Sequence, residues 1–461
     1  MISDRAVLAG RLLRAEGARS LFERWRERRV EAARRASFRP ATLDRARREL
    51  DSVPILNVLP FPLRANLGGV AIALAARLEA ERPFRSLALL QHDEGGWRLE
   101  LSASARRASV RLGGTAWRGL GHETEDPEAR RTPPRVVQEV ADALGCRLIH
   151  FESVTGLPLA ELSEWSSGRG FLLSAHDFAL FCRRPNLIEQ PAARFCGFCR
   201  DLARCARCLA TDERGASAGA QGARRGAAAR LATNAAAIVH ASEFARRSHL
   251  DLFPDLLIER QRVIAPAAPL AEATRRFTPA SPPRHVAFVG QAAAHKGLPD
   301  FAAAVSQLRS RLPRIRWSVL GGGAPEDLDS ARAAQIETLG YYRAGTLARR
   351  LVEHRIDLAV LPSRFPETHC LVLDECLGAG VPVLAADLGA LGERTRATGA
   401  GWCFDPAHAE AAIAEALFAI LGGAARPEAR APAPVSTPTA SAAAHLELYR
   451  EILARAGTEL S

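Results

Sequence analysis

The sequence predicts an α/β protein built from two Rossmann-like domains that face each other across a cleft. Short apolar runs typical of buried strands alternate with helical segments in two successive series, which indicates parallel sheets covered by helices on both faces. A stretch rich in proline and alanine, residues 265–284, separates the two series and is interpreted as a linker. Two such halves place a cleft at the carboxyl ends of both sheets.

The first series follows an arginine-rich leader, residues 1–50. Its strands are expected at residues 54–60, 86–91, 147–151, 171–175 and 237–241. After the first of these, Gly68 and Gly69 open a helical run that reaches residue 80. We assign residues 51–264 to this N-terminal, acceptor-side domain, with a cysteine-rich insertion at residues 182–208.

The second series defines a C-terminal, donor-side domain, residues 285–421. Its strands are expected at residues 285–290, 315–320, 357–362 and 381–385. Residues 422–441 are low in complexity and rich in alanine and proline, so we expect them to be disordered. Residues 442–456 are expected to form a closing helix.

Composition is that of a soluble globular protein, with 48 % apolar and 25 % charged residues in a chain of 461. No run approaches the ~20 apolar residues that cross a bilayer, and no signal peptide is visible. We therefore expect a cytoplasmic protein. Its nine cysteines are expected to be thiols or metal ligands rather than disulfides.

The leader is expected to form a basic helical extension, because it holds 14 arginines and seven acidic residues and its apolar residues recur at helical spacing. Two interpretations stay open. The helix docks on an anionic membrane surface, which makes the protein peripheral on the inner face of the membrane, or it packs on the flank of its own chain.

Lys296 is the only lysine, although lysine and arginine together number 62. It follows an apolar strand and a glycine turn and stands just before a helix. Backbone N–H groups at such a helix start point toward an anion. Lysine adds a compact point charge that the wider fork of arginine does not reproduce. The pattern therefore predicts a phosphate-binding loop.

Two glutamates, Glu367 and Glu375, follow the strand that ends at Leu361. On a helix, eight positions span ~12 Å and leave the two side chains on broadly similar faces. A nucleotide diphosphate-sugar carries hydroxyl groups at both ends, so Glu367 is expected to accept from the sugar and Glu375 from the ribose. The diphosphate between them is expected to bind the backbone amides at the helix start, which belong to Thr368, His369, Cys370 and Leu371.

With these motifs the chain resembles the retaining glycosyltransferases of family 4, the "glycosyl transferases group 1", which have the GT-B fold. The resemblance covers residues 53–456. It is carried by Glu367 to Glu375 with the following Gly378-Ala-Gly380-Val-Pro382-Val, by Phe288-Val-Gly290 with Lys296-Gly297, and by Gly68-Gly69-Val70 and His176-Asp177.

The resemblance implies a role for each of these residues. Gly290, Gln291 and Lys296 would form the phosphate loop, Glu375 would bind the ribose, and Glu367 would contact the transferred sugar. His176 would lie near the reacting centre, and Gly68 and Gly69 would let the backbone approach the diphosphate or the acceptor.

The expected donor is a UDP- or GDP-linked sugar, with no catalytic metal. The expected acceptor is a growing cell-surface polysaccharide or lipid-linked glycan.

One position departs from the family. An arginine usually follows the glycine of the phosphate loop, where this chain has Gln291. His295 or Arg364 would have to supply the missing charge. The alternatives are a slow or non-catalytic family member, or a nucleotide-sugar epimerase or phosphorylase on the same frame.

Two C-x2-C pairs, Cys196 with Cys199 and Cys205 with Cys208, predict a structural zinc that holds a loop beside His176. An unmetallated thiol cluster is the other interpretation, and Cys182 lies nearby. The resemblance implies membership of a family subgroup in which His-Asp is followed by such cysteines.

A zinc-containing nucleic-acid-binding protein is the remote alternative. It is disfavoured because aromatic residues are only 6 % and the basic leader is far in sequence from the cysteines. We therefore expect no nucleic-acid partner.

Overall fold

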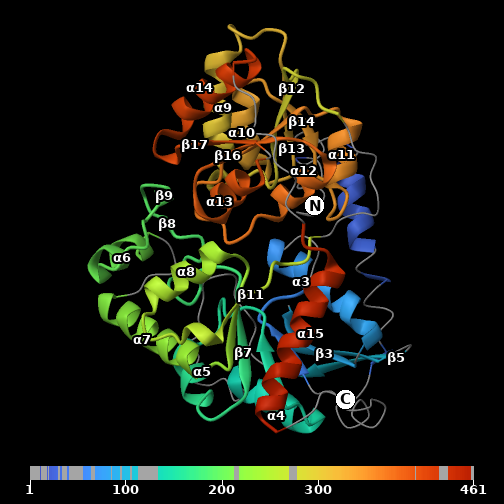
Figure 1. Ribbon diagram of the computed structural model, residues 1–461, viewed down its shortest axis with the longest axis vertical. Helices are drawn as coiled ribbons and strands as arrows, with labels where there is room; N and C mark the ends of the chain where they lie inside the picture. Colours follow the sequence, from blue (N-terminus) through green and yellow to red (C-terminus); the bar gives the residue numbers. More distant parts are fainter. Residues whose placement is uncertain are drawn as a thin grey trace, which may run out of the picture. The chain divides into compact units, whose positions relative to one another are not determined.

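The computed structural model describes residues 11, 18, 20–29, 32–33, 39–40, 55–63, 68–84, 86–93, 96–103, 106–112, 133–211, 217–268, 278–399, 401–424 and 435–457. It divides into two compact units (Figure 1). The C-terminal unit comprises Met1–Glu31 and Ala268–Ser436, and the N-terminal unit comprises Ala32–Ala267 and Thr437–Ser461.

In the described part of the N-terminal unit, nine strands form one sheet in the order β1-β5-β4-β3-β2-β6-β7-β10-β11. They are β1 (Arg39–Pro40), β2 (Ile55–Leu59), β3 (Leu87–Asp93), β4 (Gly96–Ala103), β5 (Arg106–Leu112), β6 (Leu148–Phe151), β7 (Phe171–Ala175), β10 (Ala237–His240) and β11 (Gln261–Val263). The five expected strands are all present, each within two residues of its expected limits.

Strands β4 and β5 pair antiparallel to β3 and to each other, so this sheet is mixed rather than purely parallel. This hairpin was not predicted, because the expected strands are continuous apolar runs and here apolar residues alternate with charged ones. Trp97, Leu99 and Leu101 lie in the core, whereas Arg98 and Glu100 stand between them. The short hairpin β8 (Ile188–Glu189) and β9 (Arg194–Phe195) forms a separate sheet.

Helices cover both faces of the N-terminal sheet. They are α3 (Gly69–Glu81), α4 (Pro133–Leu144), α5 (Leu159–Trp165), α6 (Leu202–Leu209), α7 (Ala218–Asn234), α8 (Glu243–Leu252) and α15 (Pro438–Arg455). Alternate residues of β2 serve opposite faces, as the pleat of a strand requires. Leu56 joins the core under α4 and α7, and Ile55 joins the one under α15. Helix α15 runs beside α3 (Figure 1). It begins four residues before the expected residue 442, inside the expected Ala/Pro segment.

In the C-terminal unit, the described residues form a six-stranded parallel sheet in the order β14-β13-β12-β15-β16-β17. Its strands are β12 (His285–Val289), β13 (Arg316–Leu320), β14 (Glu337–Gly340), β15 (Leu358–Leu361), β16 (Val383–Ala386) and β17 (Gly401–Phe404). The helices are α9 (Leu298–Leu308), α10 (Asp329–Ala333), α11 (Leu347–Glu353), α12 (Leu371–Ala379), α13 (Gly389–Thr398) and α14 (Ala409–Leu421).

The central strand β12 is apolar from Val286 to Val289 because both of its faces are covered. Phe288 packs with α9 and α14 on one side, and Val289 packs with α11 and α12 on the other. The chain order of the strands reverses between β12 and β15, which makes this pair the topological switch point where α/β sheets bind ligands.

Part of the leader, residues 20–29, is helical and packs on the C-terminal unit. The Ser20 hydroxyl accepts a hydrogen bond from the backbone N–H of Tyr341 at 3.0 Å, and the Tyr341 hydroxyl donates to Glu27 at 2.5 Å. These residues therefore follow the second interpretation of the leader, packing on their own chain. Phe22 and Trp25 of the same segment stay 55 % and 49 % exposed. None of the helices in the described ranges has the length and hydropathy needed to cross a membrane.

Candidate active site

The two loops that carry the predicted donor motifs leave neighbouring strands of the C-terminal unit. Strands β12 and β15 pair in parallel register, so the segments 290–297 and 362–370 emerge at the same sheet edge. Gly297 has φ +79° and lies so close to the chain that a Cβ would come within 1.8 Å of the Pro362 carbonyl oxygen. The Arg364 N–H donates to the His295 carbonyl at 3.0 Å. The loops are thus locked together by backbone contacts that only glycine permits.

Lys296 and Glu367 meet at this junction. The Lys296 Nζ lies 3.1 Å from Glu367 Oε1, and it also lies 4.8 Å from the centroid of the Phe365 ring. The Ser363 hydroxyl donates to the same carboxylate. Burial acts to raise the pKa of Glu367, but the ammonium and the hydroxyl outweigh it and the pKa is lowered. The pair is therefore ionised at neutral pH. Ser363 and Phe365 were not among the predicted site residues.

The backbone of Glu367 is held from the side of α13. Its carbonyl accepts from the Ala390 N–H at 2.8 Å. The preceding Gly389 has φ +65°, and a Cβ there would meet the Glu367 carbonyl oxygen at 2.8 Å. This close approach explains why a glycine stands at the start of α13. It also fixes the position of the Glu367 backbone, from which the side chain extends into the site.

Glu375 does not share a helix with Glu367, contrary to the helical spacing assumed from the sequence. Helix α12 begins at Leu371, and Cys370 before it has φ +74°. A left-handed residue breaks helical geometry, so the ~12 Å estimate for eight helical steps does not apply. Glu367 lies in the loop that precedes the helix, and Glu375 lies in the second turn.

The Glu375 carboxyl accepts hydrogen bonds from the backbone N–H groups of Gly345 and Leu347, at the start of α11. Its side chain is buried. Burial raises its pKa to about 8, the charge of Asp374 adding to the effect, although the two N–H groups act in the opposite direction. Glu375 is therefore mostly protonated at pH 7.

His369 and Asp374 organise the turn that leads into α12. The His369 Nε2 lies 2.7 Å from Asp374 Oδ2. The Arg394 guanidinium donates both to Asp374 and, at 2.8 Å, to the His369 carbonyl. Asp374 is fully buried. Burial acts to raise its pKa, but His369 and Arg394 hold it lowered. These contacts position the segment Thr368, His369, Cys370 and Leu371, whose amides were predicted to bind the diphosphate.

Neither residue proposed to replace the missing family arginine supplies an uncompensated charge. Arg364 makes a bidentate ion pair with Asp300, with both N–O distances at 2.6 Å. Burial, aided by the charge of Lys296, lowers the pKa of His295 to about 4, so this imidazole is neutral at pH 7. Gln291 itself is exposed. It follows Gly290, whose N–H donates to the Leu320 carbonyl at 3.0 Å.

His176, Gly68 and Gly69 belong to the N-terminal unit, so the structure does not join them to Lys296 and Glu367 within one compact unit. His176 and Asp177 directly follow β7. The Asp177 carboxylate accepts from the Ala179 N–H at 2.8 Å and from the Thr155 hydroxyl at 3.2 Å, and burial raises its pKa.

The glycine pair begins helix α3. Gly68 has φ +93°, and among the residues that the structure describes no atom lies within 4 Å of the position that a Cβ would occupy. The close approach of diphosphate or acceptor to this backbone stays a prediction.

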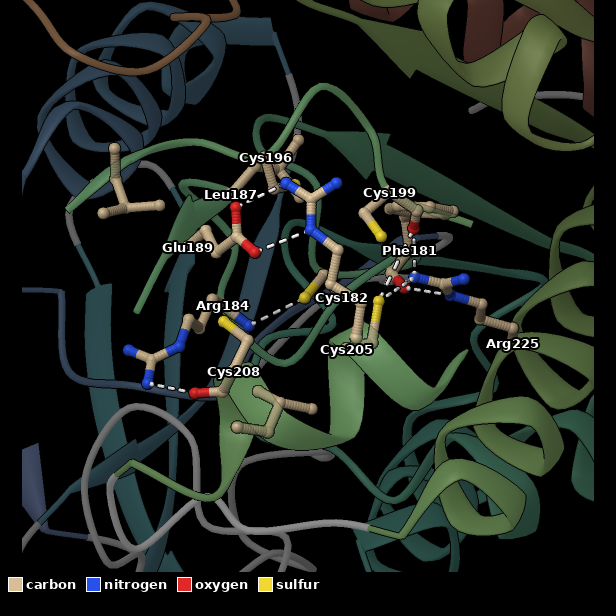
Figure 2. Close-up of a pocket in the computed structure, with 13 residues that line it drawn as sticks. Phe181, Cys182, Arg184, Leu187, Glu189, Cys196, Cys199, Cys205, Cys208 and Arg225 are labelled. Carbon is tan, nitrogen blue, oxygen red and sulfur yellow. Dashed lines mark hydrogen bonds and ion pairs between the residues drawn. The ribbon is translucent and has the colours of Figure 1, made fainter. Parts of the chain in front are cut away.

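Cys196, Cys199, Cys205 and Cys208, the predicted zinc ligands, line a cavity together with Cys182 (Figure 2). Within the ranges that the structure describes, no three His, Cys, Asp or Glu side chains already converge at positions that hold a metal ion.

Comparison with known proteins agrees with this geometry. Residues 283–422 match the family model "Glycosyl transferases group 1", so this segment is similar to the domains of that family. No curated protein sequence matches the chain significantly.

Similar solved structures include three proteins at 16 % identity or less. Sucrose-phosphate synthase from Thermosynechococcus elongatus gives a TM-score of 0.58 at 16 % identity and covers 87 % of this chain and 100 % of its own. Anabaena HepE in complex with UDP-glucose gives 0.52 at 14 % identity, with coverage of 87 % and 99 %. A glycosyltransferase from Rickettsia africae gives 0.52 at 12 %, also with 87 % and 99 %. These likenesses confirm the predicted fold class, two Rossmann-like α/β units of the GT-B type.

Proposed function

We propose that this chain, whose residues 283–422 match the glycosyl transferases group 1 model, moves a sugar from a nucleotide diphosphate-sugar to a glycan acceptor with retention of anomeric configuration. The observation that carries the proposal is the Lys296–Glu367 ion pair at the switch point between β12 and β15. A cation for phosphates and a carboxylate for sugar hydroxyls stand side by side where this fold class binds its ligands.

Each group has capacity left for the donor. The ammonium of Lys296 has three N–H donors, and the contact with Glu367 uses one of them, so two can reach phosphate oxygens. Glu367 is ionised and accepts from the hydroxyl groups of the transferred sugar. Glu375, one helical turn into α12 and mostly protonated at pH 7, can both donate to and accept from the ribose hydroxyls. Gly290, Gln291 and the amides of residues 368–371 complete the proposed diphosphate site.

Catalysis in this proposal is the stabilisation of the departing diphosphate. Negative charge grows on the phosphate oxygens as the bond to the anomeric carbon breaks, and prearranged donors favour that state over the ground state. The acceptor hydroxyl attacks from the face that the diphosphate leaves, and its proton passes to a phosphate oxygen. His176 is proposed to lie beside this reacting centre.

Two further observations support a choice of the donor's nucleotide base and of the acceptor class. Anabaena HepE was crystallised with UDP-glucose, so a UDP-linked sugar is the first donor to test and a GDP-linked sugar the second. One face of the leader helix packs on Tyr341 through Ser20 and Glu27. Phe22 and Trp25 stay exposed among arginines, and this outer face suits peripheral contact with an anionic membrane. We therefore propose a lipid-linked glycan or a growing surface polysaccharide as acceptor, at the inner face of the membrane.

Titration calorimetry with UDP, GDP and UDP-glucose tests the donor site. We expect micromolar binding of one nucleotide, and a loss of roughly tenfold or more in Lys296→Ala, because charge-assisted hydrogen bonds each contribute about 1.5–3 kcal/mol. Arg316→Ala is the matched control, since it removes a cation of the same unit from an exposed ion pair with Glu337. Absence of nucleotide binding in the wild type, or equal affinity in Lys296→Ala, would overturn the proposal.

A non-catalytic nucleotide-sugar-binding protein is the second candidate. It is favoured by Gln291 and by the lack of a compensating charge on His295 or Arg364. Nuclear magnetic resonance of UDP-glucose incubated with the protein separates the candidates. Release of UDP only with an acceptor extract supports transfer, and an unchanged donor supports binding alone. Turnover without acceptor indicates an epimerase or phosphorylase.

A further inference from the structure

Five cysteines of the N-terminal unit line a cavity of about 20 Å³ (Figure 2). Cys182 comes from the segment after β7, Cys196 and Cys199 follow β9, and Cys205 and Cys208 lie on α6. Figure 2 shows the labelled cysteines spread around the cavity, with the Glu189 carboxylate at its edge. The volume suits one occupant of about the size of a water molecule, which needs about 10–15 Å³ of cavity volume.

The first C-x2-C pair forms a turn that is shaped to present sulfur. Gly197 and Phe198, between the two cysteines, have φ values of +67° and +55°. These two left-handed residues form a tight turn between Cys196 and Cys199. The Cys196 thiol accepts from the backbone N–H groups of Phe198 and Cys199. A non-glycine residue in the left-handed region costs about 1–2 kcal/mol, and the turn that this conformation creates aims both cysteines at the cavity.

The second pair uses helical spacing. Cys205 and Cys208 are three residues apart on α6 (Leu202–Leu209) and therefore lie on one face of the helix. Asp201 caps this helix by accepting from the Ala203 N–H at 2.8 Å. A turn and a helix, each with a C-x2-C pair, thus border the same cavity.

Nitrogen donors contact three of the other sulfur atoms, whereas the Cys199 thiol donates to the Asp201 carbonyl at 3.6 Å. The Arg225 guanidinium donates to Cys205 Sγ at 3.3 Å, and the Gln190 N–H donates to Cys208 Sγ at 3.3 Å. The Arg184 N–H donates to Cys182 Sγ at 3.4 Å. Such N–H···S contacts disperse the negative charge of metal-bound thiolates. Neutral thiols packed in a core, by contrast, behave as small apolar groups.

Positive side chains border the thiols. Arg225 also donates to the Cys199 carbonyl at 2.9 Å. Arg204 makes a bidentate pair with Glu189, at 2.7 and 2.6 Å, at the edge of the cavity. Four thiolates with one divalent cation carry a net charge of −2. The Arg225 guanidinium supplies positive charge nearby, whereas the charge of Arg204 is neutralised by Glu189.

We propose that Cys196, Cys199, Cys205 and Cys208 bind one Zn²⁺ ion as a tetrahedral all-thiolate site. Zinc is chosen because a closed four-sulfur set is its usual structural environment, and because the cavity has room for one ion rather than an iron–sulfur cluster. The four side chains do not converge in this structure, so the proposal requires them to change rotamer when the ion binds. Cys182 keeps the hydrogen bond that it accepts from the Arg184 N–H and packs beside the site.

The proposed ion ties α6 to the turn after β9, and the Arg225 side chain links this pair to the loop that continues from His176 and Asp177. The Arg225 side chain already bridges them, donating to the Phe181 carbonyl at 3.2 Å and to the cavity cysteines. Zinc would thus stabilise the segment that leaves β7. This inference does not depend on glycosyl transfer, and its readouts contain no nucleotide.

Elemental analysis of the full chain, purified without a metal-affinity tag or chelator, is the first test. We expect one zinc per chain. We also expect four of the nine cysteines to react slowly with a thiol reagent until a chelator is added. A chain that contains less than about a tenth of an equivalent of zinc and binds none when Zn²⁺ is added overturns the proposal.

Cobalt substitution tests the ligand set. Co²⁺ added to the reduced apo-protein should give the intense visible bands of a tetrahedral thiolate site, and Zn²⁺ should abolish them. The bands should be lost in Cys199→Ser and in Cys205→Ser. They should persist in Cys182→Ser and in Cys403→Ser, a control in the C-terminal unit. Loss in Cys182→Ser, or persistence in Cys199→Ser and Cys205→Ser, contradicts the assignment. Circular dichroism of each variant shows whether a loss reflects unfolding, and titration of the folded wild type decides the matter if a variant does not fold.

Discussion

The ammonium of Lys296 lies 3.1 Å from the carboxylate of Glu367, and this ion pair joins the loops that leave the neighbouring strands β12 and β15. The pair is set at its distance by Gly297, which packs against Pro362, and by the Ser363 hydroxyl, which donates to the same carboxylate. This junction and the buried Glu375 are the two parts of the site that substitutions can test.

Nucleotide should protect Lys296 from an amine-specific reagent. Because Lys296 is the only lysine, such a reagent modifies its ammonium and the α-amino group alone. At ten times Kd about nine-tenths of the sites are occupied, so labelling of Lys296 should slow about tenfold. Peptide mass spectrometry measures both rates, and the α-amino group is the internal control. Equal slowing of both groups, or of neither, would place the nucleotide elsewhere.

Gln291→Arg should tighten nucleotide binding. Gln291 is exposed, so a longer side chain fits, and the charges of Arg364 and Asp300 already neutralise each other. One added charge-assisted hydrogen bond to phosphate should raise affinity by roughly tenfold. Calorimetry at two salt concentrations checks the gain and its screening. Gln307→Arg on α9 adds the same charge to the same unit, and an equal gain there would show a general electrostatic effect.

Glu375→Gln should become more stable than the wild type as the pH rises. Folding raises the pKa of Glu375 to about 8, so the folded chain binds one more proton than the unfolded chain between about pH 5 and 8. The stabilisation is therefore present at low pH and is lost as the pH approaches 8, by roughly 1 kcal/mol per pH unit.

Glutamine keeps an acceptor oxygen for the Gly345 and Leu347 amides but does not titrate. Thermal unfolding of both proteins from pH 5 to 8 measures the difference. A difference that does not change with pH would show that Glu375 has an ordinary pKa.

Gly297→Ala should destabilise the C-terminal unit more than Gly423→Ala. Both glycines have positive φ values, +79° and +75°, but only at Gly297 would a Cβ meet another atom, the Pro362 carbonyl oxygen at 1.8 Å. Backbone strain costs about 1–2 kcal/mol at either site, and overpacking adds roughly 1–3 kcal/mol at Gly297. Urea unfolding measures both. Equal losses would mean that the two loops are not locked at Gly297.

Much of the fold followed from the sequence because buried parallel strands have a continuous apolar signature. The runs at β2, β7, β12 and β15 place apolar residues on both faces, and each was located within two residues. The hairpin β4–β5 and the edge strands β14 and β17 were missed. Their apolar residues alternate with polar ones or are only partly buried, so their pairing depends on neighbours that lie far away in the chain.

The sequence by itself determined the two α/β series, the site motifs around Lys296 and Glu367, and the paired cysteines. Each of these is a local pattern of residue types and spacings. The tertiary structure decided that Lys296 pairs with Glu367, that Cys370 separates the two glutamates into loop and helix, and that Cys182 joins the four predicted cysteines around one cavity. These relationships arise from the order of the strands in the sheet and from close backbone packing at single glycines. They are contacts between segments that are distant in sequence, so residue spacing along the chain does not reveal them.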